Sequence, residues 1–197
     1  MEKKDLLKDV IKHIDIKSYN STELVDAMRN MSFTSRDTAR AADILMMMCK
    51  EKECTNILTL AGSTSAAGCM QVYVDMVRNK MIDVVVATGA SIIDMDLFEA
   101  LGYKHYIGEK ENVIPDTTLR DLYIDRIYDT YIDEEELQAC DHTTFEIANM
   151  LEARPYSSRE FIYEIGKWLH EGNAVKKDSL IQTCYECGVP IFVPAFS

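Results

Sequence analysis

Two short apolar segments on either side of one helical segment constrain the fold of this chain more than any other feature. Residues 56–62 read NILTLAG and residues 82–89 read IDVVVATG, and between them lie the small-residue turn STSAAG and the helical pattern CMQVYVDMVRNKM. Continuous apolar runs separated by a helix of this length are typical of parallel strands buried on both faces. The sequence therefore predicts a βαβ unit.

The loops after the two predicted strands are candidates for a ligand site. Right-handed crossovers place loops 62–68 and 88–96 at the carboxyl ends of the strands, on the edge where open α/β sheets bind ligands. Small residues let a ligand approach the backbone, and amides at the following helix start can hold phosphate. Asp94 and Asp96 then lie within reach of a ribose hydroxyl or a cationic group. The loops lack a GxGxxG motif, and turns of this composition also occur without a ligand.

The first 53 residues are predicted to form a mainly helical lead-in. Apolar residues recur there at helical spacing, at Leu6, Val10, Ile14, Leu24 and Met28. Thr34 and Asp37 have the spacing of a capping box, which predicts a longer helix from about Arg36.

The acidic segment 118–137, TLRDLYIDRIYDTYIDEEEL, is also predicted to be helical. Its aspartates recur every four residues, roughly on one helical face: Asp121, Asp125, Asp129 and Asp133. Such a stripe could guide a polycation, but like charges at this spacing are more commonly a solvated face, eased here by Arg120 and Arg126. We therefore interpret it as a solvated face.

The end of the chain returns to an α/β pattern. Ser157 and Glu160 have capping-box spacing for a helix that ends near Gly172. Another helix over about 177–187 then leads into a last strand, VPIFVPAFS. The chain is thus predicted to form a single α/β domain over residues 1–197.

Charge and composition exclude several kinds of partner. The formal net charge is −12, from 33 acids against 21 bases, which repels a phosphate backbone, so nucleic acid is not an expected partner. No apolar run reaches the roughly 18 residues of a spanning helix, and the start MEKKDLLKDV lacks a signal core, so we expect a cytoplasmic protein without membrane contact. The six cysteines are interpreted as packing thiols. No second ligand pair joins Cys184 and Cys187 to form a zinc site.

Several separate blocks, in the right order, resemble the deoxyhypusine synthase family. They are LTLAGSTSAAG, VVVATGASIIDMDLFEALGYKHYIG and VPIFVPAFS. The bacterial and archaeal deoxyhypusine-synthase-like branch is most similar, because it also matches SFTSRDTARAADI, LRDLYIDRIYDTYIDEEEL and RPYSSREFIYEIGKWL. The resemblance covers residues 32–197. It implies a Rossmann-like, mostly parallel sheet with helices on both faces, and tetramers that bind NAD and spermidine in sites shared between paired subunits.

The resemblance also implies a reaction. Family members transfer a hydride from spermidine to NAD, release 1,3-diaminopropane, and capture the aminobutyl unit on an active-site lysine. The unit then passes to a lysine of the hypusine-bearing translation factor or, in homospermidine synthases, to putrescine. Such chemistry needs the amine-bearing carbon held against the nicotinamide, and carboxylates to hold the ammonium groups.

The matched positions name the candidate site residues. For NAD they are Ser63, Thr64, Ser65 and Ala66 in the first loop and Thr88, Gly89 and Ala90 in the second. Asp94 and Asp96 match acidic positions of the family, one of which serves the ribose or the polyamine; the match leaves open which aspartate has that role, and either could instead be a helix N-cap. For Asp94 we favour the functional role.

One departure from the family concerns the catalytic lysine. The segment that carries it, and the preceding NAD segment with a histidine, have no counterpart in residues 1–197, since neither the lysines at 104, 167, 176 and 177 nor His105 and His142 lie in a matching motif. We therefore expect the chain to be the NAD-binding N-terminal part of an aminobutyltransferase, inactive alone, in a homo-tetramer or hetero-oligomer. The alternative is a non-catalytic paralogue or subunit that scaffolds or activates a complete partner.

Overall fold

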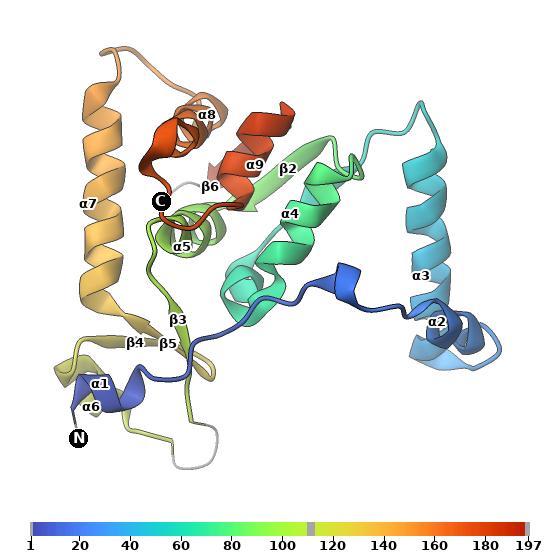
Figure 1. Cartoon of the computed structure of the whole chain (residues 1–197), viewed down its shortest axis with the longest axis horizontal. Coiled ribbons are helices and arrows are strands. Elements are labelled where there is room, and N and C mark those ends of the chain that lie inside the picture. The colour runs from blue at the N-terminus through green and yellow to red at the C-terminus, as the bar shows by residue number, and fades with distance from the viewer. Residues whose placement is uncertain (1, 110–112, 196–197) are drawn as a thin grey trace.

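A parallel three-stranded sheet lies at the centre of the computed structural model, which describes residues 2–109 and 113–195 (Figure 1). Its strands are β1 (Ile57–Thr59), β2 (Val84–Thr88) and β6 (Ile191–Ala195), in the order β1-β2-β6. Both pairings are parallel, and α4 (Met70–Arg78) connects β1 to β2. The predicted βαβ unit and the predicted last strand are confirmed.

Helices cover one face of this sheet and form the main core with it. α4, α8 (Ser158–Trp168) and α9 (Leu180–Cys187) pack together there. The buried residues in the strands and directly after β1 are Leu60, Val85, Ala87, Ile191 and Val193. Side chains that alternate with these are more exposed, Ile57 at 55% and Phe192 at 41%. The described helices therefore leave the second face of the sheet partly uncovered.

The C-terminal helices begin and end where local sequence signals predict. The Ser157 hydroxyl accepts from the Glu160 amide at 3.2 Å, and the Glu160 carboxylate accepts from the Ser157 amide at 2.9 Å, which is the predicted capping box. α8 continues into η5 (Leu169–Asn173). Gly172, at the end of η5, has a φ of 108°, which interrupts the helix. Glycine adopts this left-handed conformation without steric cost.

Segment 118–137 is not the predicted helix. Its first residues belong to the end of α6 (Asp116–Asp121), and its last residues are the first turn of α7 (Glu134–Met150). Between these helices lie two strands, β4 (Ile124–Ile127) and β5 (Thr130–Asp133). With β3 (His105–Ile107), the strands make an antiparallel sheet in the order β3-β5-β4. The four aspartates therefore share no helical face, so the predicted helical stripe was wrong, although Asp121 and Asp125 are exposed to solvent.

Two left-handed tyrosines explain this hairpin. Tyr123, at φ 55°, separates α6 from β4, and Tyr128, at φ 54°, lies in the turn between β4 and β5. Such conformations interrupt a helix. The run is rich in aromatic and β-branched residues, which favour strands, and Ile124, Tyr131 and Ile132 are buried.

The N-terminal lead-in contains helices but also an extended strap. α1 (Lys3–Leu6) is short, and residues 7–20 cross the body with only one turn, η1 (Ile16–Ser18). The Ile11 amide donates to the His105 carbonyl at 2.9 Å, and the Ile14 amide to the Gly68 carbonyl at 3.0 Å. The predicted helical pairing of Leu6, Val10 and Ile14 was wrong, because these backbone groups bond to the body instead.

The rest of the lead-in forms an arm. α2 (Thr22–Met28) packs against α3 (Phe33–Lys50), and Figure 1 shows both standing apart from the body, on the side away from β6. α3 begins three residues before the predicted Arg36, with Ser32 at its N-cap. Only Ala39 of α3 is buried.

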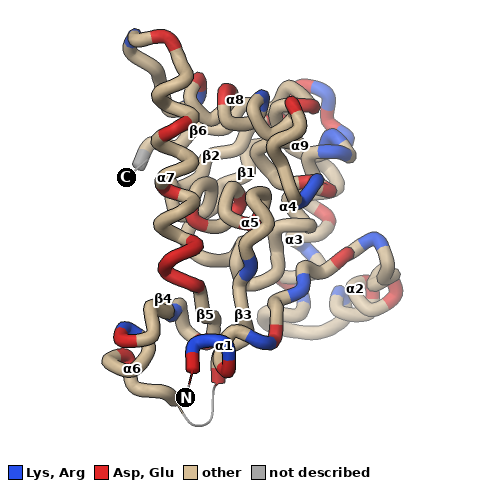
Figure 2. The backbone as a smooth tube through the Cα atoms, turned by 60° about the vertical axis from the view of Figure 1, so that its left-hand side comes forward, with Lys and Arg blue, Asp and Glu red and all other residues tan. Residues whose placement is uncertain are grey.

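Acidic and basic residues are interspersed along the backbone, with acids at the start of α7 (Figure 2). Glu134, Glu135 and Glu136 lie in its first turn, where the helix dipole favours negative charge. Among the helices of residues 2–109 and 113–195, none is long and apolar enough to cross a membrane.

Candidate functional site

The loops after β1 and β2 meet at the carboxyl edge of the parallel sheet. The first contains η2 (Gly62–Thr64) and η3 (Ser65–Cys69), and the second continues into η4 (Ala90–Leu97) and α5 (Phe98–Ala100). The buried Ser91 hydroxyl donates to the Gly62 carbonyl at 2.9 Å and lies 3.1 Å from the Thr88 hydroxyl. The prediction that both loops share one edge is confirmed.

The first loop offers open backbone and one unpaired hydroxyl. Gly62, at φ 65°, has no atom within 4 Å of where a Cβ would lie. Ser65 and Ala66 are buried, and the Ser65 Oγ has no hydrogen-bond partner within the described part of the chain. Ser63 is half-buried and Thr64 exposed, and the Thr64 hydroxyl accepts from the Tyr73 hydroxyl at 2.9 Å. A buried polar atom without a partner costs free energy, so a ligand that pairs with it gains affinity.

The second loop supplies a half-buried carboxylate. Thr88 is half-buried, Gly89 buried and Ala90 exposed. Farther along η4, burial, together with the neighbouring Asp141 carboxylate, raises the pKa of Asp94 to about 6. A carboxyl group with this pKa is largely ionised at pH 7, yet it lacks a described cation nearby to neutralise it.

Asp96 has a different role from Asp94. It is 1% exposed, and its two carboxylate oxygens accept from the amides of Leu180 and Ile181 at 2.8 and 2.7 Å. Burial raises its pKa to about 6, although these two hydrogen bonds act in the opposite direction. The carboxylate thus caps the start of α9 across the fold. The alternative predicted from the sequence was a cap of the adjacent helix, whereas in the structure both oxygens of Asp96 are engaged by α9.

A second buried carboxylate, Glu99, holds the strap to the body. It bonds to His13 Nε2 at 2.6 Å, to His105 Nδ1 at 3.0 Å and to the Lys176 ammonium. Burial alone would raise the pKa of Glu99, but the bonds from His105 and His13 and the charge of Lys176 bring it well below its usual range. Lys176 is therefore paired with an anion. No sequence pattern predicts that Glu99, His13, His105 and Lys176 lie together.

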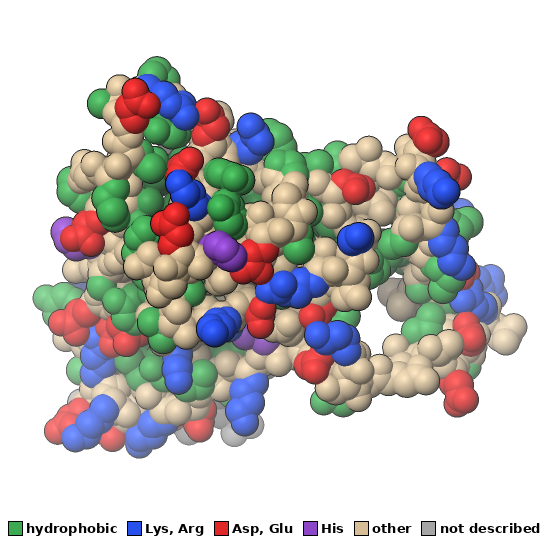
Figure 3. Space-filling view, turned by 45° about the horizontal axis from the view of Figure 1, so that its top comes forward, with side chains coloured by type: hydrophobic (Ala, Val, Ile, Leu, Met, Phe, Trp, Pro, Cys, Tyr) green, Lys and Arg blue, Asp and Glu red, His purple; other side chains and the backbone are tan. Residues whose placement is uncertain are grey.

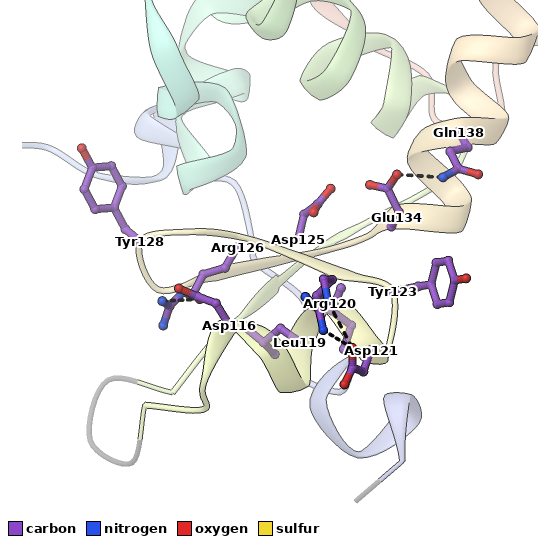
Figure 4. Close-up of a pocket in the computed structure, with 11 residues that line it drawn as sticks. Asp116, Leu119, Arg120, Asp121, Tyr123, Asp125, Arg126, Tyr128, Glu134 and Gln138 are labelled. Atoms are coloured by element: carbon purple, nitrogen blue, oxygen red, sulfur yellow. Dashed lines mark hydrogen bonds and ion pairs between the residues drawn. The ribbon is translucent and has the colours of Figure 1, made fainter.

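A large cavity lies elsewhere, on the small antiparallel sheet (Figure 4). It encloses about 1210 Å³. Arg126 lies 2.5 Å from Asp116, and Arg120 pairs with Asp121 at 2.8 Å. A hydrogen bond with Glu134, followed by burial, raises the pKa of Asp125 to about 6. Since most of its charges are paired within the protein, the cavity is a weaker candidate than the loop edge.

The cysteines do not assemble a further site in the described residues. Cys184 is buried and Cys187 exposed at the end of α9, and burial raises the pKa of the Cys140 thiol to about 12. Among residues 2–109 and 113–195, no three Cys, His, Asp or Glu side chains are placed to hold a metal ion.

Comparison with known proteins decides the family. The family model for deoxyhypusine synthase matches residues 23–197. The chain belongs to the deoxyhypusine synthase family. A deoxyhypusine synthase-like protein of Caulobacter vibrioides is 67% identical over 195 residues, which are 99% of this chain and 53% of that protein. One from Coxiella burnetii is 58% identical over 99% of this chain and 55% of its own length.

The fold agrees with this assignment. The crystal structure of a "putative deoxyhypusine synthase" from Entamoeba histolytica aligns with a TM-score of 0.58 at 20% identity, over 94% of this chain and 62% of that one. At this identity the match concerns the fold alone. The resemblance predicted from the sequence is confirmed, and the chain spans about half the length of the deoxyhypusine synthase-like relatives it matches.

Proposed function

We propose that this chain is the NAD-binding part of a deoxyhypusine synthase-like transferase that moves an aminobutyl group from spermidine to an acceptor amine. The observation that carries the proposal is the Ser91–Gly62 contact, which brings together two small-residue loops in a member of this family. The proposed acceptor is either putrescine or a lysine of a hypusine-bearing translation factor. The proposed assembly is a homo-tetramer or a hetero-oligomer, and the proposed location is the cytoplasm.

The residues of the loop edge fit NAD. Gly62 leaves its backbone open, and the Ser65 hydroxyl is a buried group without a described partner. The matched positions would hold the dinucleotide: Ser63, Thr64, Ser65, Ala66, Thr88, Gly89 and Ala90. When bound, NAD would accept a hydride from the amine-bearing carbon of spermidine.

Asp94 would add orientation and charge to this site. An ionised carboxylate can accept from a ribose hydroxyl or pair with an ammonium group of the polyamine. Because its pKa is raised to about 6, the carboxylate would lose this ability as the pH falls below that value. Asp96 is left out of the proposed site because α9 engages both of its oxygens.

NAD binding can be tested directly by calorimetric titration of the chain. Ala90→Leu places a larger side chain at the exposed start of η4 and should raise the Kd for NAD at least tenfold. Ala148→Leu, at an exposed position of α7, is the matched control, and its Kd for NAD should stay within twofold of wild type. Wild-type protein that binds no NAD, alone or with the remaining part of the Caulobacter relative, would contradict the proposal.

Turnover separates the two functional hypotheses. With NAD and spermidine, the isolated chain should form neither NADH nor 1,3-diaminopropane, because the family's lysine segment has no counterpart in it. Addition of the remaining part of the Caulobacter relative should restore both products. If NAD binds but neither the isolated chain nor its mixture with the remaining part of the Caulobacter relative turns over spermidine, the chain is better explained as a non-catalytic subunit. Turnover by the chain alone would contradict the expectation that it lacks the catalytic lysine.

A further inference from the structure

Two consecutive residues of the strap each hold one of the two loops that follow β1 and β2. The His13 side chain bonds through Nε2 to the Glu99 carboxylate at 2.6 Å, and Glu99 lies in α5, which continues η4 and the second loop. The Ile14 amide donates to the Gly68 carbonyl at 3.0 Å, and Gly68 lies in η3 of the first loop. The strap therefore bridges the two loops, in addition to the direct hydrogen bond between them.

The contact at Gly68 leaves no room for a side chain. Gly68 is buried and has a φ of 94°. A Cβ at this position would lie 2.9 Å from the Lys12 carbonyl oxygen and 3.7 Å from the Ile11 side chain. A carbon atom cannot lie that close to a backbone oxygen unless the strap or the loop shifts. The glycine thus allows the strap backbone to lie directly against the first loop.

Lys17 adds a contact to the helix behind the first loop. Its ammonium lies 2.7 Å from the Asp75 carboxylate in α4, the helix that begins directly after η3. The Lys17 side chain is 59% exposed, so solvent screens this pair and its contribution to stability is small. The His13 side chain is 14% exposed. Its bond to Glu99 is therefore the less screened of the two side-chain contacts.

The strap buries little surface of its own. None of residues 7–20, all of which the structure describes, is buried, and residues 14–20 are exposed. Figure 1 shows the strap running across the body toward the arm, and Figure 3 shows a gap between the arm and the body. Segments with few buried contacts open locally at a small cost in free energy. The strap can therefore detach while the rest of the fold stays intact.

We propose that the bound strap positions the two loops for NAD and that His13 is a positioning residue of this site, acting through Glu99. The ligand in this inference rests on the proposed function, whereas the ordering of the loops by the strap does not. With the strap bound, adjacent residues hold Glu99 and Gly68, so the loops lose less conformational entropy when a ligand binds. Because coupling between two sites is reciprocal, bound NAD should in turn hold the strap closed.

Calorimetric titration with NAD tests the positioning role. His13→Ala removes the bond to Glu99 and should raise the Kd for NAD at least fivefold. His13→Gln keeps a side-chain N–H donor and should stay within twofold of wild type. The matched control is His170→Ala, which removes another histidine–glutamate bond, to Glu186 at 3.1 Å between η5 and α9, and should also stay within twofold. An unchanged Kd in His13→Ala would overturn the positioning role.

Hydrogen exchange of the wild-type protein tests the reciprocal effect without a substitution. The Ile14 amide is protected by its bond to the Gly68 carbonyl, so its exchange reports opening of the strap. Saturating NAD should slow this exchange at least fivefold. The Glu134 amide, which donates to the Tyr123 carbonyl at 3.1 Å on the small sheet, is the control and should change less than twofold. An Ile14 amide that exchanges equally fast with NAD bound would refute the coupling.

A measurement without NAD separates failure of this inference from failure of the proposed function. The Ser91 amide donates to the Thr88 hydroxyl at 3.3 Å within the second loop. Without NAD, it should exchange at least fivefold faster in His13→Ala than in wild type or His170→Ala. If wild type binds no NAD, the proposed function fails, yet faster Ser91 exchange in His13→Ala still supports ordering of the loops by the strap. Unchanged Ser91 exchange would refute that ordering whether or not NAD binds.

Discussion

The Ser91 hydroxyl donates to the Gly62 carbonyl at 2.9 Å across the ends of two neighbouring strands. This bond ties the first residue of η2 to the start of η4. Its Ser91 end is buried, since Ser91 is 1% exposed, whereas Gly62 is exposed. The bond therefore fixes the distance between the two loops that are proposed to hold a dinucleotide.

Ser91→Ala should destabilise the protein by about 0.5–1.5 kcal/mol, because it removes a hydrogen bond of the buried Ser91 hydroxyl, while the carbonyl of the exposed Gly62 can bond to water instead. Ser18→Ala removes an exposed hydroxyl that bonds to Asp15 and should cost less than about 0.5 kcal/mol. Urea unfolding measures both. The same Ser91→Ala variant should bind NAD more weakly, and an unchanged Kd would show that the bond does not organise the site.

Sequence predicted the parts of the fold that local signals specify. The βαβ unit follows from two apolar runs and a helix, and the Ser157–Glu160 capping box from a spacing of three residues. Segment 118–137 was misjudged because its aspartate spacing matches a helix, whereas its aromatic and β-branched residues favour strands. The left-handed conformations of Tyr123 and Tyr128 have no such local signal, because aromatic residues rarely adopt a positive φ.

Side chains that act over long sequence separation could not be predicted. Asp96 caps a helix that starts 84 residues later, and nothing near Asp96 in the sequence points to α9. Glu99 joins His13, His105 and Lys176 from three other segments. In the sequence, the neighbours of these residues are those expected around surface charges or helix caps, and the distant contacts are visible only in the structure.

Asp94 should titrate abnormally, with a pKa of about 6 that falls in Asp141→Asn. Burial and the Asp141 carboxylate both raise the pKa, and the substitution removes only the second cause. Carbon-detected NMR of the Asp94 carboxyl group measures the value in each protein. A pKa near the unperturbed value of about 3.9 in wild type would contradict the described burial of this side chain.

The same titration has a consequence for stability. Between about pH 4 and pH 6 the folded protein keeps a proton on Asp94 that the unfolded chain releases, so this group's contribution to stability falls as pH rises. Asp94→Asn removes that contribution. The variant should therefore gain stability relative to wild type from pH 4 to pH 7 in urea unfolding, and a constant difference would argue against the raised pKa.

Glu99→Gln should destabilise the protein by about 3 kcal/mol at pH 7, because it removes the anion that His13, His105 and Lys176 share in a buried site. Lys176→Ala should cost less, since its side chain is 35% exposed and the two histidine bonds remain. Proteolysis within strap residues 7–20 should accelerate in Glu99→Gln, because His13 loses its charged partner. Equal costs for the two variants would contradict the central position of Glu99.

The Glu99 contribution should also depend on pH. The pKa of Glu99 is lowered in the folded state, so its stabilisation is present above the unfolded value of about 4.3 and is lost as pH falls toward the folded value. The difference in unfolding free energy between wild type and Glu99→Gln should therefore be full at pH 6 and shrink below about pH 4. A difference that grows on acidification would have the wrong sign.

Tyr128 offers a stabilising substitution. It is 90% exposed and takes a φ of 54° in the turn between β4 and β5, a conformation that is unfavourable for an aromatic residue and better tolerated by asparagine. Tyr128→Asn should raise the free energy of unfolding by about 0.5–1 kcal/mol. Tyr19→Asn changes an exposed tyrosine with an ordinary extended backbone, φ −126°, and should give no gain. Destabilisation by Tyr128→Asn would mean that the ring contributes contacts that outweigh the backbone strain.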